Sequence, residues 1–279
     1  REHDFDYMSR KEEDLNMKCI QTEQYVELTR EKFYLRLIPL EEEVFRCVFS
    51  QEPITDTDSD FIDPTGFSPA PYSIEETEHS FRLRTSCVLA EILKEDGRII
   101  WKRQAEGGIL LEEGRKELEK IDVMRYTTGD EAPVINRVKT VDGERNFIQN
   151  LKQTADHQAY KGRLHFRWKA EEGIYGLGQA EEGVCNYRGH DQYLYQHNMR
   201  IPMPVLLSDQ GYGMLFDCGS LMTFHDGPDD SYLFFDIISR MDYYLIAKQT
   251  PDEIIGTIRS LTGRAAMLPK WAFGYIQSK

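Results

Sequence analysis

Stretches in which apolar and polar residues alternate dominate the first third of the chain. Four of them are rich in Val, Ile, Tyr and Phe and repeat with a period of two: 25–40, 44–50, 79–93 and 97–103. This pattern is typical of half-buried β-strands. Glu95, Asp96 and Gly97 separate the last two stretches and favour a hairpin turn. The pattern predicts an antiparallel sheet.

The same alternation returns in the last third. The expected strands are 199–208, 212–218, 221–226, 232–238 and 241–248. Turn-forming residues at 209–211 and 227–230 separate some of them, which predicts a β-meander of successive hairpins. Many short strands at a spacing of about ten residues, with one late helix, favour a mainly β fold, an antiparallel β-sandwich.

One segment has a strong helix signal, at 250–263. Thr250 can cap it, Pro251 suits its first turn, Glu253 completes a capping box and Gly263 can end it. We expect its buried stripe to be Ile254, Ile255, Ile258 and Leu261. The segment 112–121 is a weaker helix candidate.

Composition limits the partners of the chain. Asp and Glu number 48 against 34 Lys and Arg, a net charge of −14 over 279 residues. This balance disfavours nucleic acid and acidic membranes, whereas a neutral small molecule is unaffected by it. No stretch reaches the run of about 20 apolar residues that spans a bilayer.

The cysteines and the charged start indicate a compartment. The five cysteines are odd in number and widely spaced, so we expect free thiols in a reducing environment. The first residues are charged, lack an initiator Met and contain no apolar signal segment. We therefore expect a cytoplasmic protein.

Three sequence features imitate metal or cofactor sites. Asp56, Asp58 and Asp60 begin like a calcium loop, but Phe occupies its sixth and twelfth positions. The spacing of Cys185, His190 and His197 matches no common zinc site. The segment 176–178 lacks the third glycine of a dinucleotide loop, so a tight turn accounts for it better. We expect no metal and no cofactor.

A loop after an expected buried strand carries more hydrogen-bonding groups than a connection needs. Its candidate binding residues lie within eleven positions: Arg188, His190, Asp191, Tyr193, Gln196 and Asn198. The plainer alternative is that its amides satisfy backbone groups of a long connection. His225, beside Asp226, is interpreted as a hairpin residue because no nucleophile motif accompanies it.

Three separated motifs resemble the N-terminal part of glycoside hydrolase family 31, the α-glucosidase and α-xylosidase family. They are IYGLGQAEEG from Ile174, IPMPVLLSDQGYGMLFD from Ile201 and LTGRAAMLPKWAFGYIQSK from Leu261. The resemblance implies a galactose mutarotase-like sandwich at 1–248, a helix and linker at 249–268, and the first strand of a truncated (β/α)8 TIM barrel at 269–279.

The resemblance also implies a function. The family hydrolyses α-linked glucosides or xylosides with retention, using two carboxylates. Its nucleophile motif resembles W-x-D-M-N-E and does not occur here. We therefore expect a non-catalytic part that buttresses its own C-terminal catalytic barrel, with an α-linked oligosaccharide or glycoside as ligand. The family often assembles, so a homo-oligomer is an open alternative, but the sequence does not determine the oligomeric state.

The loop acquires a role through the same resemblance. The segment 187–191 is similar to the family's aromatic-Arg-His-Asp loop with Gly189 inserted. Asp191 would then accept a hydrogen bond from a sugar hydroxyl, while Arg188 and His190 would orient it or shape the pocket. A sugar offers hydroxyls around an apolar ring face, which Tyr193, Gln196 and Asn198 would match.

Two other functions remain open. One is a stand-alone carbohydrate-binding sandwich without catalysis. The other is an aldose epimerase of mutarotase-like fold, which needs a His and Glu pair, with His165 as its histidine.

Overall fold

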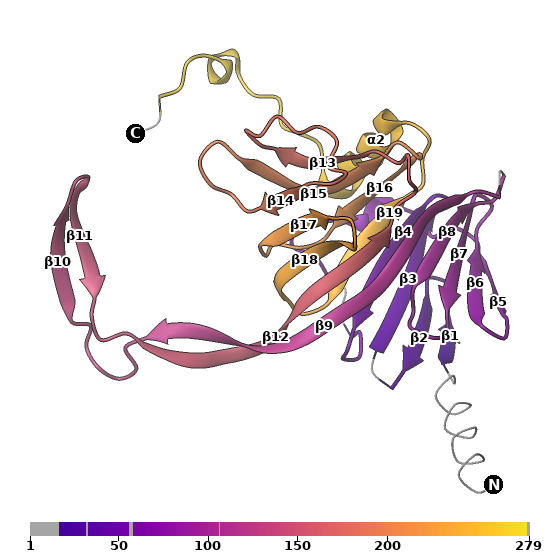
Figure 1. Ribbon diagram of the computed structural model, residues 1–279, viewed down its shortest axis with the longest axis horizontal. Coiled ribbons are helices and arrows are strands. Elements are labelled where there is room, and N and C mark those ends of the chain that lie inside the picture. The colour runs from indigo at the N-terminus through magenta and orange to yellow at the C-terminus, as the bar shows by residue number, and fades with distance from the viewer. Residues whose placement is uncertain (1–16, 32, 56–57, 106, 278–279) are drawn as a thin grey trace, which may run out of the picture.

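Two antiparallel β-sheets lie face to face and form a β-sandwich, as predicted (Figure 1). The computed structural model describes residues 17–31, 33–55, 58–105 and 107–277. Among these residues no helix is long and apolar enough to cross a bilayer.

The first sheet has eight strands. In spatial order they are β1 (Lys18–Gln21), β2 (Val26–Arg30), β3 (Phe33–Glu41), β4 (Val44–Ser50), β19 (Met241–Ile246), β16 (Tyr212–Phe216), β15 (Ile201–Ser208) and β13 (Ile174–Gln179).

The second sheet has nine strands. Their spatial order is β14 (Asp191–Leu194), β17 (Met222–Asp226), β18 (Ser231–Ile238), β12 (Lys152–Arg167), β9 (Ile109–Thr127), β8 (Ile99–Arg103), β7 (Val88–Leu93), β6 (Ser80–Arg84) and β5 (Ser73–Glu76). The hairpin turn expected between β7 and β8 is confirmed, with Gly97 at a φ of 71°.

The meander expected in the last third is only partly formed. β15 pairs with β16, and β17 with β18, as hairpins. After β16, however, the chain crosses to the second sheet, and after β18 it returns, so that β19 lies between β16 and β4. Alternating strands of this kind can join either sheet, and burial between the two sheets decides which one.

The core lies between the sheets, and both polar and apolar contacts join the two sheets there. Phe45 of β4 packs on Trp101 of β8, with ring centroids 5.2 Å apart. Tyr243 of β19 donates a hydrogen bond of 2.8 Å to the Glu113 carboxylate of β9. The two sheets are therefore held in register by specific contacts and by apolar burial.

The helix α2 (Pro251–Thr262) forms where it is expected, with the capping box of Thr250 and Glu253 in place. It covers the outer face of the first sheet beside η1 (Pro64–Gly66). Ile254, Ile258 and Leu261 are buried there, but Ile255 is 44% exposed, so its predicted burial is wrong. Only one side of a helix meets a flat sheet, and Ile255 lies off that side.

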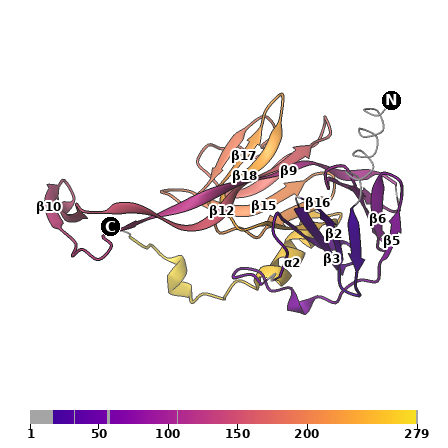
Figure 2. The same ribbon diagram turned by 90° about the horizontal axis from the view of Figure 1, so that it is seen from below.

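The helix considered at 112–121 does not form, because this segment belongs to the strand β9. β9 and β12 run together far beyond the sandwich as a two-stranded ribbon, which β10 (Ile135–Thr140) and β11 (Gly143–Ile148) continue as a hairpin (Figures 1 and 2). Charges opposite each other, such as Arg167 and Glu112 at 2.8 Å, suit this pairing.

The strand expected at 269–279 is absent from the described residues 269–277. This segment instead contains η2 (Lys270–Phe273) and extends away from the sandwich (Figure 1). Trp271, Phe273 and Tyr275 are at least 73% exposed. A buried strand needs neighbours to satisfy its backbone, and no described strand lies beside this segment.

Candidate functional site

A bulge in β13 leads into the candidate loop. Gly176 and Gly178 have φ values of 100° and 96°, and Leu177 between them has 60°. A Cβ on Gly178 would lie 2.1 Å from the Ile201 carbonyl oxygen of the paired strand β15. The segment is thus a β-bulge inside a strand, and the tight turn expected there is wrong, because the ladder with β15 continues on both sides.

Arg188 anchors the loop to the body. Its Nε donates to Asp226 Oδ2 at 2.9 Å, and its Nη1 donates to the carbonyl oxygens of Lys169 and Glu172. The Gly189 amide and the Ser231 hydroxyl donate to the same Asp226 carboxylate. Burial alone would raise the pKa of Asp226, but these hydrogen bonds lower it below its usual value.

Asp191 begins β14 and is held by a residue that the sequence interpretation set aside. Its carboxylate lies 2.6 Å from His225 Nδ1, directly across the pair β14 and β17. His225 in turn packs against Tyr232, at 4.9 Å between ring centroids. His225 is therefore a positioning partner of Asp191, which only the strand register reveals.

Aromatic side chains continue along the loop beyond Asp191. Tyr193 and Tyr195 meet edge to face at 6.4 Å, and Tyr195 contacts His197 at 5.1 Å. Tyr193 is 56% exposed and Tyr195 41%. Exposed aromatic rings beside a held carboxylate offer both the apolar face and the polar group that a sugar ring requires.

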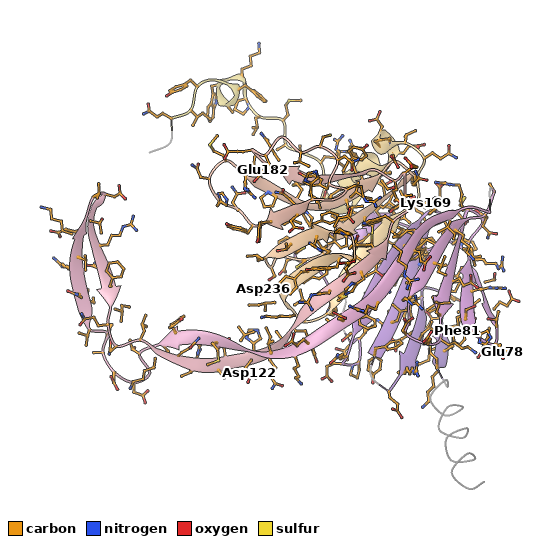
Figure 3. All side chains as sticks on the ribbon, in the orientation of Figure 1. Glu78, Phe81, Asp122, Lys169, Glu182 and Asp236 are labelled. Carbon is orange, nitrogen blue, oxygen red and sulfur yellow. The ribbon has the colours of Figure 1, made fainter. Side chains whose placement is uncertain are left out.

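The remaining candidates lie on the same surface loop. Gln196 donates from its side-chain amide to the His197 carbonyl oxygen at 3.2 Å, and Asn198 is exposed. The loop is fixed at its base by an ion pair of Arg200 with Glu182. Figure 3 labels Glu182 at this end of the molecule. Local amide bonding of Gln196 agrees with the plainer alternative for that residue.

The six candidates thus divide into two groups. Arg188 has its guanidinium engaged with the body, whereas His190, Asp191, Tyr193, Gln196 and Asn198 are exposed. The sugar-binding role of all six stays a prediction. The described residues contain no cluster of three metal-ligating side chains, and Asp56 of the aspartate triplet lies outside them.

His165, the residue considered for epimerase chemistry, is buried on β12. Its Nδ1 lies 2.9 Å from Asp230 Oδ1, and its Nε2 lies 3.4 Å from Glu117 Oε2. Register places it in one row with Tyr232, His225 and Asp191 across four strands. The row links the loop to the interior of the second sheet.

Known proteins of similar sequence include an α-xylosidase and an α-glucosidase. The α-xylosidase of Saccharolobus solfataricus is 34% identical over 140 residues, covering 47% of this chain and 19% of that protein. α-Glucosidase 2 of Bacillus thermoamyloliquefaciens is 24% identical over 242 residues, covering 75% and 30% respectively. No family model matches the chain.

Solved structures of family 31 enzymes share the fold of this chain. A family 31 α-xylosidase from a soil metagenome, complexed with xylose, superposes with a TM-score of 0.67 at 23% identity, over 91% of this chain and 36% of that one. The chain has the fold of this family 31 enzyme over most of its length. The family 31 α-xylosidase of Xanthomonas citri superposes with a TM-score of 0.69 at 14% identity, over 91% and 41%.

The chain covers only part of the length of these similar proteins. It spans about a fifth of the length of the Saccharolobus relative and less than half of the two solved xylosidases. Its two antiparallel sheets and its helix match the β-sandwich region of the family.

Proposed function

We propose that this chain is the non-catalytic N-terminal part of an α-glycosidase that hydrolyses α-linked glucosides or xylosides with retention. The observation that carries the proposal is the 34% identity to an α-xylosidase over 140 residues. The sandwich has the fold of the xylose-complexed family 31 enzyme over 91% of the chain.

In this proposal the sandwich buttresses a catalytic barrel formed by the rest of the polypeptide. The exposed aromatic residues Trp271, Phe273 and Tyr275 of the extended C-terminal segment support this role. Apolar side chains at such exposure are costly in water, and the first strand of a barrel would bury them.

The loop contributes to the sugar pocket. Asp191 accepts a hydrogen bond from a sugar hydroxyl while His225 fixes the orientation of its carboxylate at 2.6 Å. Tyr193 offers its exposed ring to the sugar face. A reducing, cytoplasmic setting is part of the proposal and is supported by five free cysteines.

Kinetics of the protein encoded by the full reading frame test this role. Asp191→Asn and Tyr193→Ala are expected to lower kcat/KM on an aryl α-xyloside or α-glucoside by about tenfold or more, since each removes a substrate contact. His79→Ala is the matched control, because His79 is exposed on the body beside β6. Unchanged kcat/KM in both loop variants would contradict the loop's role.

The isolated 279-residue chain tests the non-catalytic assignment. It is expected to show no turnover of these substrates, because both hydrolytic carboxylates belong to the barrel. Turnover at the rate of the full protein, or a reading frame that encodes no barrel, would overturn the proposal in favour of a self-contained enzyme or binding module.

A further inference from the structure

The outer part of the β9–β12 ribbon and the hairpin of β10 and β11 project from the sandwich without burying a single residue. We call residues 122–158 the arm; all of them are described, and none is buried. Both views show the arm standing clear of the body (Figures 1 and 2). A two-stranded ribbon on its own is only marginally stable in water, so a surface packed against it would stabilise the arm.

Exposed apolar side chains are concentrated on the arm. It holds 37 of the 279 residues but nine of the 26 large apolar side chains that are exposed in the described chain. Single apolar side chains are ordinary on a surface, whereas a concentration of them marks an interaction surface. The nine are Met124, Tyr126, Val134, Ile135, Val138, Val141, Phe147, Ile148 and Leu151.

The strand register gives the ribbon one face without charge. Tyr126 lies opposite Gln153, and Met124 lies opposite Ala155. Alternate residues of a strand share a face, so these four side chains lie together. We call them the neutral face. The Tyr126 side chain is 70% exposed and that of Met124 is 44% exposed, so the neutral face has apolar area to bury.

Charged residues border the neutral face and occupy the other side of the ribbon. Asp122 follows on the same face at the end nearer the sandwich. The opposite face carries Arg125 and Lys152, which form ion pairs with Asp156 at 3.4 Å and with Glu131 at 2.6 Å. Two copies of the charged face would meet with like charges opposed, whereas the neutral face meets its own copy without that cost.

The distribution of charge favours a second copy of this chain as the partner. The arm has a net charge of −1, which leaves −13 of the total of −14 on the body, so two bodies repel each other at close range. In two ribbons packed face to face in opposite directions, the bodies lie at opposite ends. Six residue pairs at about 3.4 Å each separate them by roughly 20 Å, twice the screening length of about 10 Å at 0.1 M salt.

We propose that two copies of this chain associate through their arms, with the neutral faces of the two ribbons packed against each other about a twofold axis. The same surface then serves on both copies, as in most homodimers. The face is small against the roughly 20–30 residues per side of a stable complex, so the dimer forms reversibly. The inference goes beyond the proposed function and does not depend on it, because only residues of the arm carry it.

Sedimentation velocity of the 279-residue chain over a range of concentrations tests the association. The sedimentation coefficient is expected to rise from the monomer value to the dimer value. Tyr126→Glu places a carboxylate in the neutral face of both copies and is expected to raise the dissociation constant at least about tenfold. Arg125→Glu is the matched control, because the next residue along the strand lies on the opposite face. It changes the charge of the arm more and is expected to leave the dissociation constant unchanged.

Hydrogen exchange locates the contact on the ribbon. The backbone amides of 122–127 and 152–158 are expected to exchange about tenfold more slowly in the dimer than in the monomer, because packing suppresses local opening of the ribbon. Amides of the core strand β4 are the internal reference and are expected to exchange at the same rate in both.

The exposed C-terminal segment provides the alternative route of association. Association that survives in Tyr126→Glu and is lost in a Trp271→Ala, Phe273→Ala double variant would place the contact on that segment and refute the arm dimer. A chain that stays monomeric at about 1 mM also refutes it. In the protein encoded by the full reading frame, ribbon amides that are protected equally at monomeric and dimeric concentrations would show that the rest of the polypeptide covers the neutral face instead.

Discussion

The strands β9 and β12 form one continuous antiparallel pair with two different halves. The base, 112–121 paired with 159–167, lies within the sandwich, and Leu118, Leu164 and Phe166 are buried there. The arm, defined as residues 122–158, extends outward, and none of its residues, all of them described, is buried. The same backbone ladder therefore exists with and without a core.

The difference shows what each interaction supplies. Cross-strand hydrogen bonds give the ribbon its shape in both halves, but a two-stranded ribbon alone is only marginally stable in water. Burial in the base supplies the free energy that the arm lacks. The arm also carries five Lys and Arg against six Asp and Glu, so paired charges rather than apolar contacts cover it.

The largest expected effect concerns the buried charge pair in the base. Lys116 Nζ lies 2.5 Å from Glu113 Oε2, and both side chains have no exposure. Glu113→Ala leaves the ammonium buried and is expected to lower the free energy of unfolding by about 3–5 kcal/mol in urea denaturation. Glu144→Ala on the exposed arm is the control. A loss below about 1 kcal/mol at Glu113 would contradict the comparison.

Apolar truncation gives the next effect. Leu164→Ala removes a side chain with no exposure. It is expected to lower the free energy of unfolding, measured by urea denaturation, by about 2–5 kcal/mol. Phe147→Ala on the arm, where the ring is 50% exposed, is expected to cost less than about 0.5 kcal/mol. Equal losses of unfolding free energy at the two positions would show that Phe147 is packed in the arm as well as Leu164 is packed in the base.

The dependence of stability on acid pH gives a further test, through the Glu91 carboxylate on β7. Its hydrogen bond from Lys102, helped by Arg82 and opposed by burial, lowers its pKa to about 2 from 4.5. The pKa of Glu91 is lower in the folded state than in the unfolded state. The contribution of its ionised carboxylate to the free energy of unfolding is therefore present above about pH 4.5 and is lost as the pH falls toward about 2. The urea midpoint of Glu91→Gln should therefore fall less steeply over this range than that of the unchanged protein.

The matched control for Glu91 lies on the arm. Glu131 pairs with Lys152 at 2.6 Å, but both side chains are more than half exposed. Glu131→Gln is expected to leave the acid dependence unchanged. If Glu91→Gln also leaves it unchanged, another carboxylate controls the acid response.

The smallest effect is expected for removal of most of the arm. Replacing residues 126–153 by Asn-Gly joins Arg125 to Thr154, which already face each other across the ribbon, through a favoured hairpin turn. The free energy of unfolding should change by less than about 0.5 kcal/mol, because no buried residue is lost. A loss above about 2 kcal/mol would show that the arm stabilises the body.

Local patterns predicted most of the individual elements. The alternating segments became strands, and the capping box of Thr250 and Glu253 placed α2 correctly. The segment 112–121 was ambiguous because its few apolar residues fit a helix stripe as well as a strand. Its partner β12 lies about 40 residues away along the chain, and local signals carry no information on such pairing.

The candidate site was found only in part. Its polar loop was visible as a dense run of hydrogen-bonding residues, but the partner of Asp191 was not. His225 is 34 positions away, and only the register of β14 and β17 brings the two side chains to 2.6 Å. A motif search for a nucleophile could not reveal a positioning histidine.

By itself the sequence determined the β class, the late helix, the resemblance to family 31 and the polar loop, because these depend on neighbouring residues and short spacings. Only the tertiary structure decided which sheet each strand joins, the exposed arm and the Asp191–His225 pair. These depend on burial and register between distant segments, where one residue's shift in pairing turns a side chain from the core to the solvent.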